Sequence, residues 1–315
     1  MNIGRYILVI LSIMIMKKLY DKVDGDSNMV NDYNLVNKFL ISGNDLAQDN
    51  KPILWIHLNY EVNARDWKSF YSRNTRQLNQ PYHYITIKST VDKCGNDFNI
   101  CLIDDDSFSV LLPRWNVELH KVSEPVKSKL RELALAQLLY NYGGCLIPGS
   151  MKCYTNMIQM YNENTNDNKM FVGEFLNTAE HSDKQLVSLN TRLMGCNSQC
   201  SSMKDYIDYL SNLISTDYSN ESIFNGETSE WLFENLNNIN VIPSELLGAI
   251  DRNRDPITID RLMGKTYIDL SPNIIGLYIP EKDILQRVKY EWFARSNVDQ
   301  VLSGNYALSK LLLIQ

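Results

Sequence analysis

The chain has 315 residues, of which 44% are hydrophobic and 22% are charged. This is enough apolar material for one large domain or two small ones, and it excludes wholesale disorder. The 31 Lys and Arg residues are outnumbered by 37 Asp and Glu, which gives a net charge of −6, and there is no long basic run, so we expect no nucleic-acid partner. The six cysteines are scattered, without the density of a disulfide scaffold or of zinc knuckles.

The N-terminus carries an uncharged apolar run, YILVILSIMIM at positions 6–16, with basic residues on both sides. As a helix this run is about 16 Å long, whereas the hydrocarbon core of a bilayer is about 30 Å thick, so a span would need residues 3–20. We expect residues 1–20 to be a hydrophobic anchor or signal-anchor that makes the protein membrane-associated, in an orientation that the sequence does not fix. A cleaved signal peptide and a buried or interfacial helix are the alternatives.

Residues 21–51 are polar and rich in Asn, Asp, Gly and Ser, which predicts a stalk or linker with one short helix. The composition changes at Pro52, where the apolar run ILWIHL is typical of a buried first strand. We therefore expect one folded domain over residues 52–315.

A crossover helix and two more strands are predicted next. Aromatic residues at helical spacing predict the helix over residues 66–78, and HYITIK at 83–88 predicts the second strand. The third strand, NICLI at 99–103, runs directly into Asp104, Asp105 and Asp106. Polar charge at the end of a buried strand marks the edge at which open α/β sheets bind ligands.

A stripe of leucines predicts a helix over residues 128–142 that is stopped by Gly143 and Gly144. A short strand over 145–147 follows and ends at Pro148-Gly149-Ser150. Further along, the pattern indicates strands at 169–176 and 185–193, helices at 203–214 and 229–236, and a helical region at 282–302. Together these elements predict an α/β fold with a mainly parallel, Rossmann-like sheet flanked by helices. Its neighbouring buried strands are expected at 53–57, 85–87, 100–103 and 145–147.

Several residues of types that often carry chemistry have ordinary structural explanations. A lone histidine in an apolar strand, such as His57, is more often a hydrogen-bonded core or cleft residue than a catalyst. Cys196 and Cys200 have no second cysteine or histidine pair near them, so a disulfide or two unrelated thiols are expected before a metal site. The glycosylation sequon at Asn220 is expected by chance in a chain rich in asparagine. Of the tryptophans, Trp55 is the best candidate for a role outside the core.

Three segments follow one another along the chain: ILWIHL as a first strand, NICLIDDDSF as a strand ending in acidic residues, and LLYNYGG at the end of a helix. This order resembles the glycosyltransferases with a DXD sugar-binding region, which include the mannosyltransferase-like and capsular polysaccharide synthesis groups. The resemblance covers about residues 52–157, more loosely about 52–245, and its most specific piece is 139–144. It implies the GT-A fold of the nucleotide-diphospho-sugar transferases.

The family consensus is roughly D-x-x-R-x-x-x-L-x-x-x-G-G-x-Y-x-D-x-D, and this chain matches it in part. The leucine and the glycine pair fall on Leu139, Gly143 and Gly144, as expected. Glu132 takes the place of the aspartate that approaches the donor sugar. The arginine and tyrosine positions both hold leucine, although Arg131 lies one turn before the arginine position on nearly the same helix face.

The two aspartates of the DXD motif fall on Pro148 and Ser150. In the family these aspartates hold a divalent cation that bridges the donor diphosphate and neutralises the leaving group, and hard cations need oxygen ligands. A proline side chain has no ligand atom and a neutral hydroxyl is a poor replacement, so we expect the metal site to be absent. The carboxylates of residues 104–106 could substitute, but a solvated acidic turn that caps the following segment is the preferred interpretation.

The resemblance also assigns site roles by position. The catalytic candidates are Glu132, Asp104 and Asp106; the donor-binding candidates are Trp55, His57, Arg131, Gly143, Gly144 and Ser150; no metal ligand is assigned.

Two functions of different classes are compatible with this pattern. The loss of both aspartates favours a glycosyltransferase-like protein without the usual metal-dependent activity and without a cofactor. In this hypothesis it is kept as a membrane-anchored binding or structural module for an unknown protein partner. The alternative is an active glycosyltransferase that moves a sugar from a nucleotide-sugar donor to a glycan or protein, with Mn²⁺ or Mg²⁺ as its cofactor. Either would place a nucleotide sugar or a glycan in the site, whereas an unrelated α/β structural protein is a third interpretation.

Overall fold

The computed structural model describes residues 51–58, 80–177, 186–216 and 221–314. The main sheet consists of β1 (Ile53–His57), β2 (Asn99–Ile103), β3 (Gly144–Pro148), β5 (Met170–Leu176), β6 (Val187–Cys196) and β7 (Ile239–Ile242). A separate pair is formed by β4 (Met151–Cys153) and β8 (Gly276–Tyr278). The longer helices are α2 (His83–Cys94), α4 (Val126–Tyr142), α5 (Ile158–Thr165), α6 (Ser201–Ser215) and α7 (Glu221–Glu234). The shorter ones are α3 (Phe108–Leu111), α8 (Ile259–Leu262), α9 (Glu281–Gln286), α10 (Glu291–Arg295), α11 (Val298–Leu302) and α12 (Ala307–Leu313).

The strands of the main sheet lie in the order β2-β1-β3-β6-β5-β7. β1 pairs in parallel with β2 and β3, β5 pairs in parallel with β7, and β6 is antiparallel to both β3 and β5. Within this sheet β6 therefore runs against the other five strands. The predicted α/β class with a mainly parallel sheet is confirmed.

Side chains of β1 alternate between two cores, as the pleat of a strand requires. Leu54 and Ile56 join the core on one face of the sheet, whereas Trp55 joins the core on the other, and all three are at most 1% exposed. This two-sided burial explains why the run ILWIHL is apolar throughout and does not alternate with polar residues.

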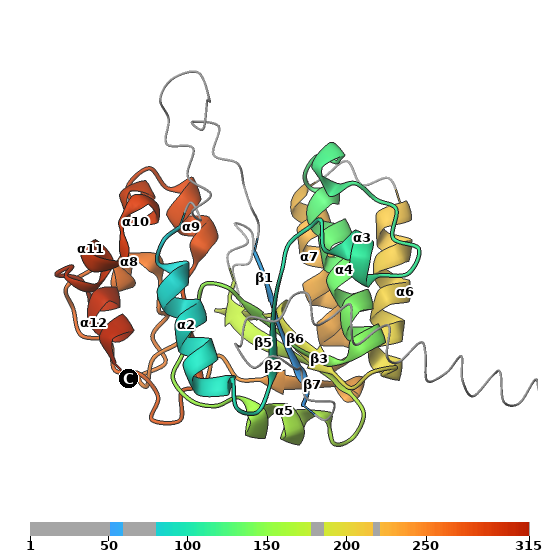
Figure 1. The fold of residues 1–315 in the computed structure, drawn as a ribbon, viewed down its shortest axis with the longest axis horizontal. Coiled ribbons are helices and arrows are strands. Elements are labelled where there is room, and N and C mark those ends of the chain that lie inside the picture. The colour runs from blue at the N-terminus through green and yellow to red at the C-terminus, as the bar shows by residue number, and fades with distance from the viewer. Residues whose placement is uncertain (1–50, 59–79, 178–185, 217–220, 315) are drawn as a thin grey trace, which may run out of the picture.

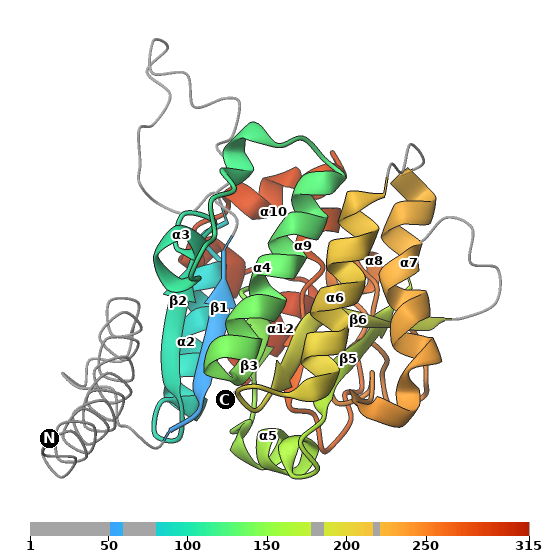
Figure 2. The same ribbon diagram turned by 90° about the vertical axis from the view of Figure 1, so that its right-hand side faces the viewer.

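Helices cover both faces of the sheet (Figure 1). The face that Trp55 enters is covered by α4, α6 and α7, which stand side by side in Figure 2. The opposite face is covered by α2 and α5, whose buried Cys94, Met160 and Tyr161 pack against it. Beside α2, the short helices α8 to α12 pack around a third core of their own, to which Tyr82 also belongs.

Most predicted elements coincide with observed ones. The strands expected at 53–57, 99–103, 145–147, 169–176 and 185–193 are β1, β2, β3, β5 and β6. The helix expected at 128–142 is α4, that at 203–214 is α6, and that at 229–236 overlaps the end of α7. The helical region at 282–302 is divided among α9, α10 and α11.

The strand predicted at 83–88, including the buried segment 85–87, is wrong, because these residues begin helix α2. The buried positions recur at helical spacing, and they are small or polar: His83, Thr86, Ser89, Thr90 and Cys94. Two of the hydroxyls bond within the helix, since the Thr86 hydroxyl lies 3.0 Å from the His83 carbonyl and the Ser89 hydroxyl 2.6 Å from the Thr86 carbonyl. An analysis that looked for apolar periodicity missed this face, because the alternation of β-branched residues in HYITIK mimics a strand.

The predicted membrane localisation needs correction. In the part of the chain that the structure describes, none of the helices has the length and apolar character needed to cross a bilayer. The expected anchor at residues 1–20, nearly all of the expected stalk at 21–51 and the expected helix at 66–78 lie outside the described residues.

Candidate functional site

The three parallel strands β2, β1 and β3 end in one row at one edge of the sheet. His57 is the last residue of β1, and it is in register with Ile103 of β2 and with Pro148 of β3. The acidic segment 104–106 and the turn at 149–150 therefore both emerge at this edge, which we call the strand edge. This is where ligands bind in open α/β sheets.

An ion triad occupies the strand edge. The Arg131 guanidinium donates two hydrogen bonds of 2.7 Å to the two carboxylate oxygens of Asp105, and His57 Nε2 lies 3.0 Å from Asp105 Oδ1. The His57 ring stacks on Phe108 with centroids 5.5 Å apart. Burial by itself would raise the pKa of Asp105, but the contacts with Arg131 and His57 outweigh it and hold that pKa well below its ordinary value. Both oxygens of the Asp105 carboxylate are thus hydrogen-bonded to the Arg131 guanidinium.

The two neighbouring aspartates have different surroundings. Asp104 Oδ1 accepts hydrogen bonds from the Ser107 amide at 2.9 Å and from the Ser107 hydroxyl at 2.6 Å, which fixes the turn before α3. Asp106 is exposed, and its carbonyl accepts a hydrogen bond from the Ser109 hydroxyl at 2.8 Å. Throughout the described ranges, no three His, Cys, Asp or Glu side chains are grouped so that they could hold a metal ion. The sequence analysis named Asp104 and Asp106 as catalytic candidates, but the residue that the structure joins to His57 and Arg131 is Asp105.

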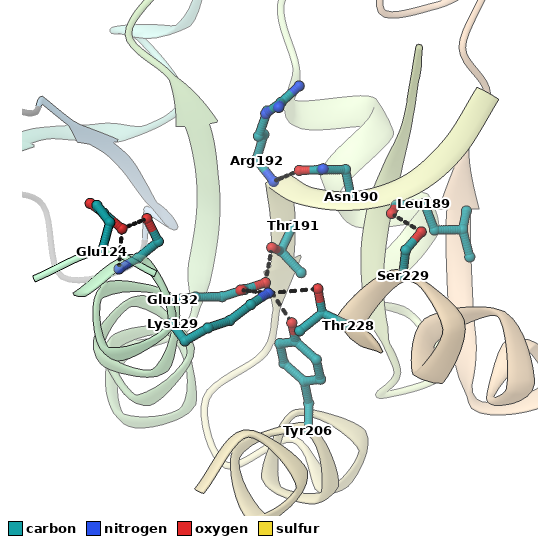
Figure 3. A network of polar contacts seen from close by, with 11 residues as sticks. Glu124, Lys129, Glu132, Leu189, Asn190, Thr191, Arg192, Tyr206, Thr228 and Ser229 are labelled. Carbon is teal, nitrogen blue, oxygen red and sulfur yellow. Dashed lines mark hydrogen bonds and ion pairs between the residues drawn. The ribbon is translucent and has the colours of Figure 1, made fainter. Parts of the chain in front are cut away.

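Glu132 lies in a separate polar cluster between α4, β6, α6 and α7 (Figure 3). It forms an ion pair of 3.0 Å with Lys129 and accepts hydrogen bonds from the hydroxyls of Tyr206, at 2.6 Å, and Thr191. Lys129 Nζ also donates to the Thr228 hydroxyl at 2.9 Å. Burial would raise the pKa of Glu132, but Lys129 and the two hydroxyls lower it overall.

Both carboxylate oxygens of Glu132 are thus bound by other side chains of the protein. Lys129, Thr191, Tyr206 and Thr228 were not identified from the sequence. The spacing of three between Lys129 and Glu132 on one helix could have indicated the ion pair.

Trp55 and the glycine pair lie away from the strand edge. Gly144 begins β3, so Gly143 and Gly144 are at the opposite edge of the sheet from Pro148. Gly143 ends α4 with a φ of +70°, and a Cβ on Gly144 would lie 2.1 Å from the carbonyl oxygen of Ile53. The fully buried Trp55 donates its indole N–H to the Gly143 carbonyl at 3.0 Å. These three residues were predicted to bind the donor, but their contacts in the structure are with the protein's own backbone and hold the fold together.

The turn after β3 is covered by other parts of the chain. Ser150 is 0% exposed, and its hydroxyl has no hydrogen-bond partner among the described residues. The Thr86 hydroxyl donates to the Gly149 carbonyl at 2.6 Å, and a Cβ on Gly149 would lie 2.4 Å from a methyl group of Leu58. The position that aligns with the second DXD aspartate is therefore inside the protein and closed to a ligand.

Two basic side chains lie near the triad. The Arg192 guanidinium is 5.3 Å from the ring centre of Tyr278. Lys282 is exposed, but partial desolvation lowers its pKa, and the positive charges of Arg192 and Arg131 lower it further, whereas the carboxylates of Glu124 and Glu281 raise it. The three cations therefore lie in one region together with two carboxylates. Among the described residues, no carboxylate lies within ion-pair distance of Arg192 or Lys282. The sequence analysis missed both, because they come from elements far apart in the chain.

No family model matches this chain, and no curated protein does either. Among solved structures, the chain is similar to the apo form of mouse xyloside xylosyltransferase 1, with 10% identity and a TM-score of 0.42 over 73% of this chain and 98% of that one. It is also similar to the bifunctional glycosyltransferase WbbM, with 8% identity and a TM-score of 0.41 over 78% of this chain and 51% of that one. For the galactosyltransferase LgtC in complex with donor and acceptor sugar analogues, the identity is 9% and the TM-score 0.36 over 78% and 96%. These superpositions are too loose to assign the chain to a family.

Proposed function

We propose that this chain is a glycosyltransferase-like protein that does not perform metal-dependent sugar transfer and serves as a binding module for a nucleotide sugar or a glycan. The observation that carries the proposal is the ion triad at the strand edge. Arg131 engages both oxygens of Asp105 at 2.7 Å, where a metal-dependent enzyme needs free carboxylates.

The chemistry of the residues at this edge supports the absence of a metal. Residues 148 and 150 are a proline without a ligand atom and a fully buried serine. Asp104 is hydrogen-bonded within its own turn, so it would have to break two contacts with Ser107 to bind a cation. A catalytic cation contributes a large part of the stabilisation of a departing diphosphate, and without it the transfer reaction loses that contribution.

Positive charge near the triad supports a phosphate-bearing ligand. Among the described residues, Arg192 and Lys282 form no direct ion pair, although the Glu281 carboxylate is close enough to interact with both. A guanidinium can bind phosphate oxygens through paired hydrogen bonds, which would hold a nucleotide sugar without a metal ion. An unidentified protein partner would then bind the ligand-bound form of the module.

Binding and turnover of UDP- and GDP-linked sugars test this proposal. We expect one or more of them to bind by calorimetry in the presence of EDTA, with at least a fivefold loss of affinity in Arg192→Gln. The matched control is Arg295→Gln, which removes an arginine that pairs with Glu291 on α10 and should leave the affinity unchanged.

With Mn²⁺ added we expect no hydrolysis or transfer above the uncatalysed rate. Metal-dependent hydrolysis that Asp104→Asn or Asp106→Asn abolishes would instead establish the active glycosyltransferase. If none of the nucleotide sugars or free glycans binds, the proposed binding role is wrong.

A further inference from the structure

Two buried cysteines from distant parts of the chain meet between α2 and β4. Cys94 ends α2 and Cys153 ends β4, and their sulfur atoms are 3.8 Å apart. Both side chains are 0% exposed, and both thiols are free. The two thiols are thus within hydrogen-bonding distance of one another, and the Cys153 sulfur also lies 3.0 Å from the Thr155 carbonyl oxygen.

The backbone around the pair is held in place by neighbouring hydrogen bonds. The Cys153 amide donates to the Ser89 hydroxyl on α2 at 2.9 Å, which joins β4 to the same helix that carries Cys94. The S–S bond of a disulfide is about 2.05 Å long, so the sulfurs would have to approach by about 1.8 Å.

The two thiols differ in acidity because they interact with one another. The contact with Cys153 lowers the pKa of Cys94. The same contact, together with burial, raises the pKa of Cys153. Of the two buried thiols, Cys94 therefore has the greater thiolate character, and the thiolate is the nucleophile.

We propose that Cys94 and Cys153 are an oxidisable pair that forms a reversible disulfide when the protein meets a hydroperoxide. In the first step the Cys94 thiolate attacks one peroxide oxygen, the O–O bond breaks, and the departing hydroxide takes a proton to give water and a sulfenic acid. In the second step the Cys153 sulfur, losing its proton, attacks the Cys94 sulfur, the S–O bond breaks, and a second water leaves. Two thiols and one hydrogen peroxide give one disulfide and two waters.

The bond would fix α2 against the segment that follows the strand edge. The same helix already holds this segment through the hydrogen bond from Thr86 to the Gly149 carbonyl. The disulfide would close a loop between positions 59 residues apart, and a cross-link over a loop of that length restricts the unfolded chain strongly. The inference concerns the cysteines alone and does not depend on the proposed function.

Peptide mapping of the peroxide-treated protein tests the inference. The full chain is incubated with hydrogen peroxide, alkylated, digested without reductant and analysed by mass spectrometry. We expect a linked peptide that contains Cys94 and Cys153, its disappearance after dithiothreitol, and a rise of about 5 °C or more in the unfolding midpoint of the oxidised protein. Cys94→Ala and Cys153→Ala should each lose the midpoint shift, whereas Cys101→Ala, another fully buried cysteine, should keep it.

The mapping of the wild-type chain decides the matter even if one of these variants does not fold. Recovery of Cys94 and Cys153 as separately alkylated peptides after peroxide treatment would refute the inference. A link from Cys94 to Cys145, the buried cysteine of β3 that also interacts with Cys94, would refute it as well.

Discussion

Replacing Arg131 by methionine tests whether the ion triad stabilises the strand edge. Methionine keeps an unbranched apolar stem of similar length but removes the two hydrogen bonds of 2.7 Å to Asp105. The Asp105 carboxylate would remain partly buried, with His57 as its remaining ion-pair partner among the described residues. We expect a less stable protein, because a buried charge without its partner is costly.

The size of the effect follows from the exposure of the two side chains. Arg131 is 14% exposed and Asp105 is 26% exposed, so the pair is mostly, but not fully, removed from water. Breaking a fully buried pair costs about 3–5 kcal/mol, and hydration of the exposed part of Asp105 reduces this. We expect the variant to lose about 2–4 kcal/mol of unfolding free energy at pH 7.

Urea unfolding followed by circular dichroism measures the loss, with Arg295→Met as the matched control. Arg295 pairs with Glu291 at 2.9 Å on an exposed helix face, and its removal should cost less than about 1 kcal/mol. The double variant Arg131→Met with Asp105→Asn should recover part of the loss, because it removes the unpaired charge.

The loss of unfolding free energy in Arg131→Met should depend on pH in a defined direction. In the wild type the lowered pKa of Asp105 contributes stability that is present above its unfolded value of about 3.9 and is lost as the pH falls toward the folded value. Without Arg131 the pKa of Asp105 rises. Acid therefore protonates this carboxylate, and removes its unpaired charge, at a higher pH in the variant than in the wild type. The difference between the two proteins should therefore shrink on acidification. A difference below 1 kcal/mol at pH 7, or one that grows as the pH falls, would refute the reasoning.

Three further substitutions have expected outcomes. Gly144→Ala should lower the free energy of unfolding by more than about 3 kcal/mol, because its Cβ would lie 2.1 Å from the Ile53 carbonyl oxygen at a φ of +104°. The control Gly264→Ala, whose Cβ would have its nearest contact at 3.2 Å, should lose less stability in the same thermal unfolding assay. Lys129→Met should cost about 3 kcal/mol in urea unfolding at pH 7, and less in acid, because it leaves Glu132 unpaired. Ser150→Asp should prevent stable folding or cost more than about 4 kcal/mol, since it places a carboxylate at a position that is 0% exposed; a soluble, cooperatively unfolding variant would contradict this.

The sheet could be predicted from the sequence where the chain uses ordinary local signals. β1 and β3 are short apolar runs between breakers, and α4 carries a leucine stripe that ends at a glycine with positive φ. Helix α2 could not be predicted in the same way. Its buried face consists of hydroxyl, imidazole and thiol groups that bond partly within the helix and partly to distant residues, as Thr86 does to the Gly149 carbonyl, 63 residues away. Such a face has no apolar periodicity to detect.

The site was only partly accessible to sequence reasoning for a related reason. The acidic cluster was correctly located at a strand end, but the sequence could not say which of its three aspartates turns inward. That choice depends on the meeting of Asp105 with Arg131, which is 26 residues away on α4, and with His57, which is 48 residues away on β1. Glu132, the residue next to Arg131 on the same helix, faces β6 and α6 instead.

The most specific piece of the glycosyltransferase resemblance, residues 139–144, is also a segment whose conformation the fold requires. Gly143 and Gly144 allow α4 to end and β3 to begin within hydrogen-bonding distance of β1, and a side chain on Gly144 would collide with that strand. These constraints act at the edge of the sheet opposite the strand edge, so they apply whether or not a sugar is transferred. At the strand edge itself, where catalysis would constrain the residues, the chain has Pro148, a buried Ser150 and a carboxylate neutralised by Arg131. A glycine pair in this position therefore indicates the architecture, whereas activity depends on the residues at the other end of the same strand.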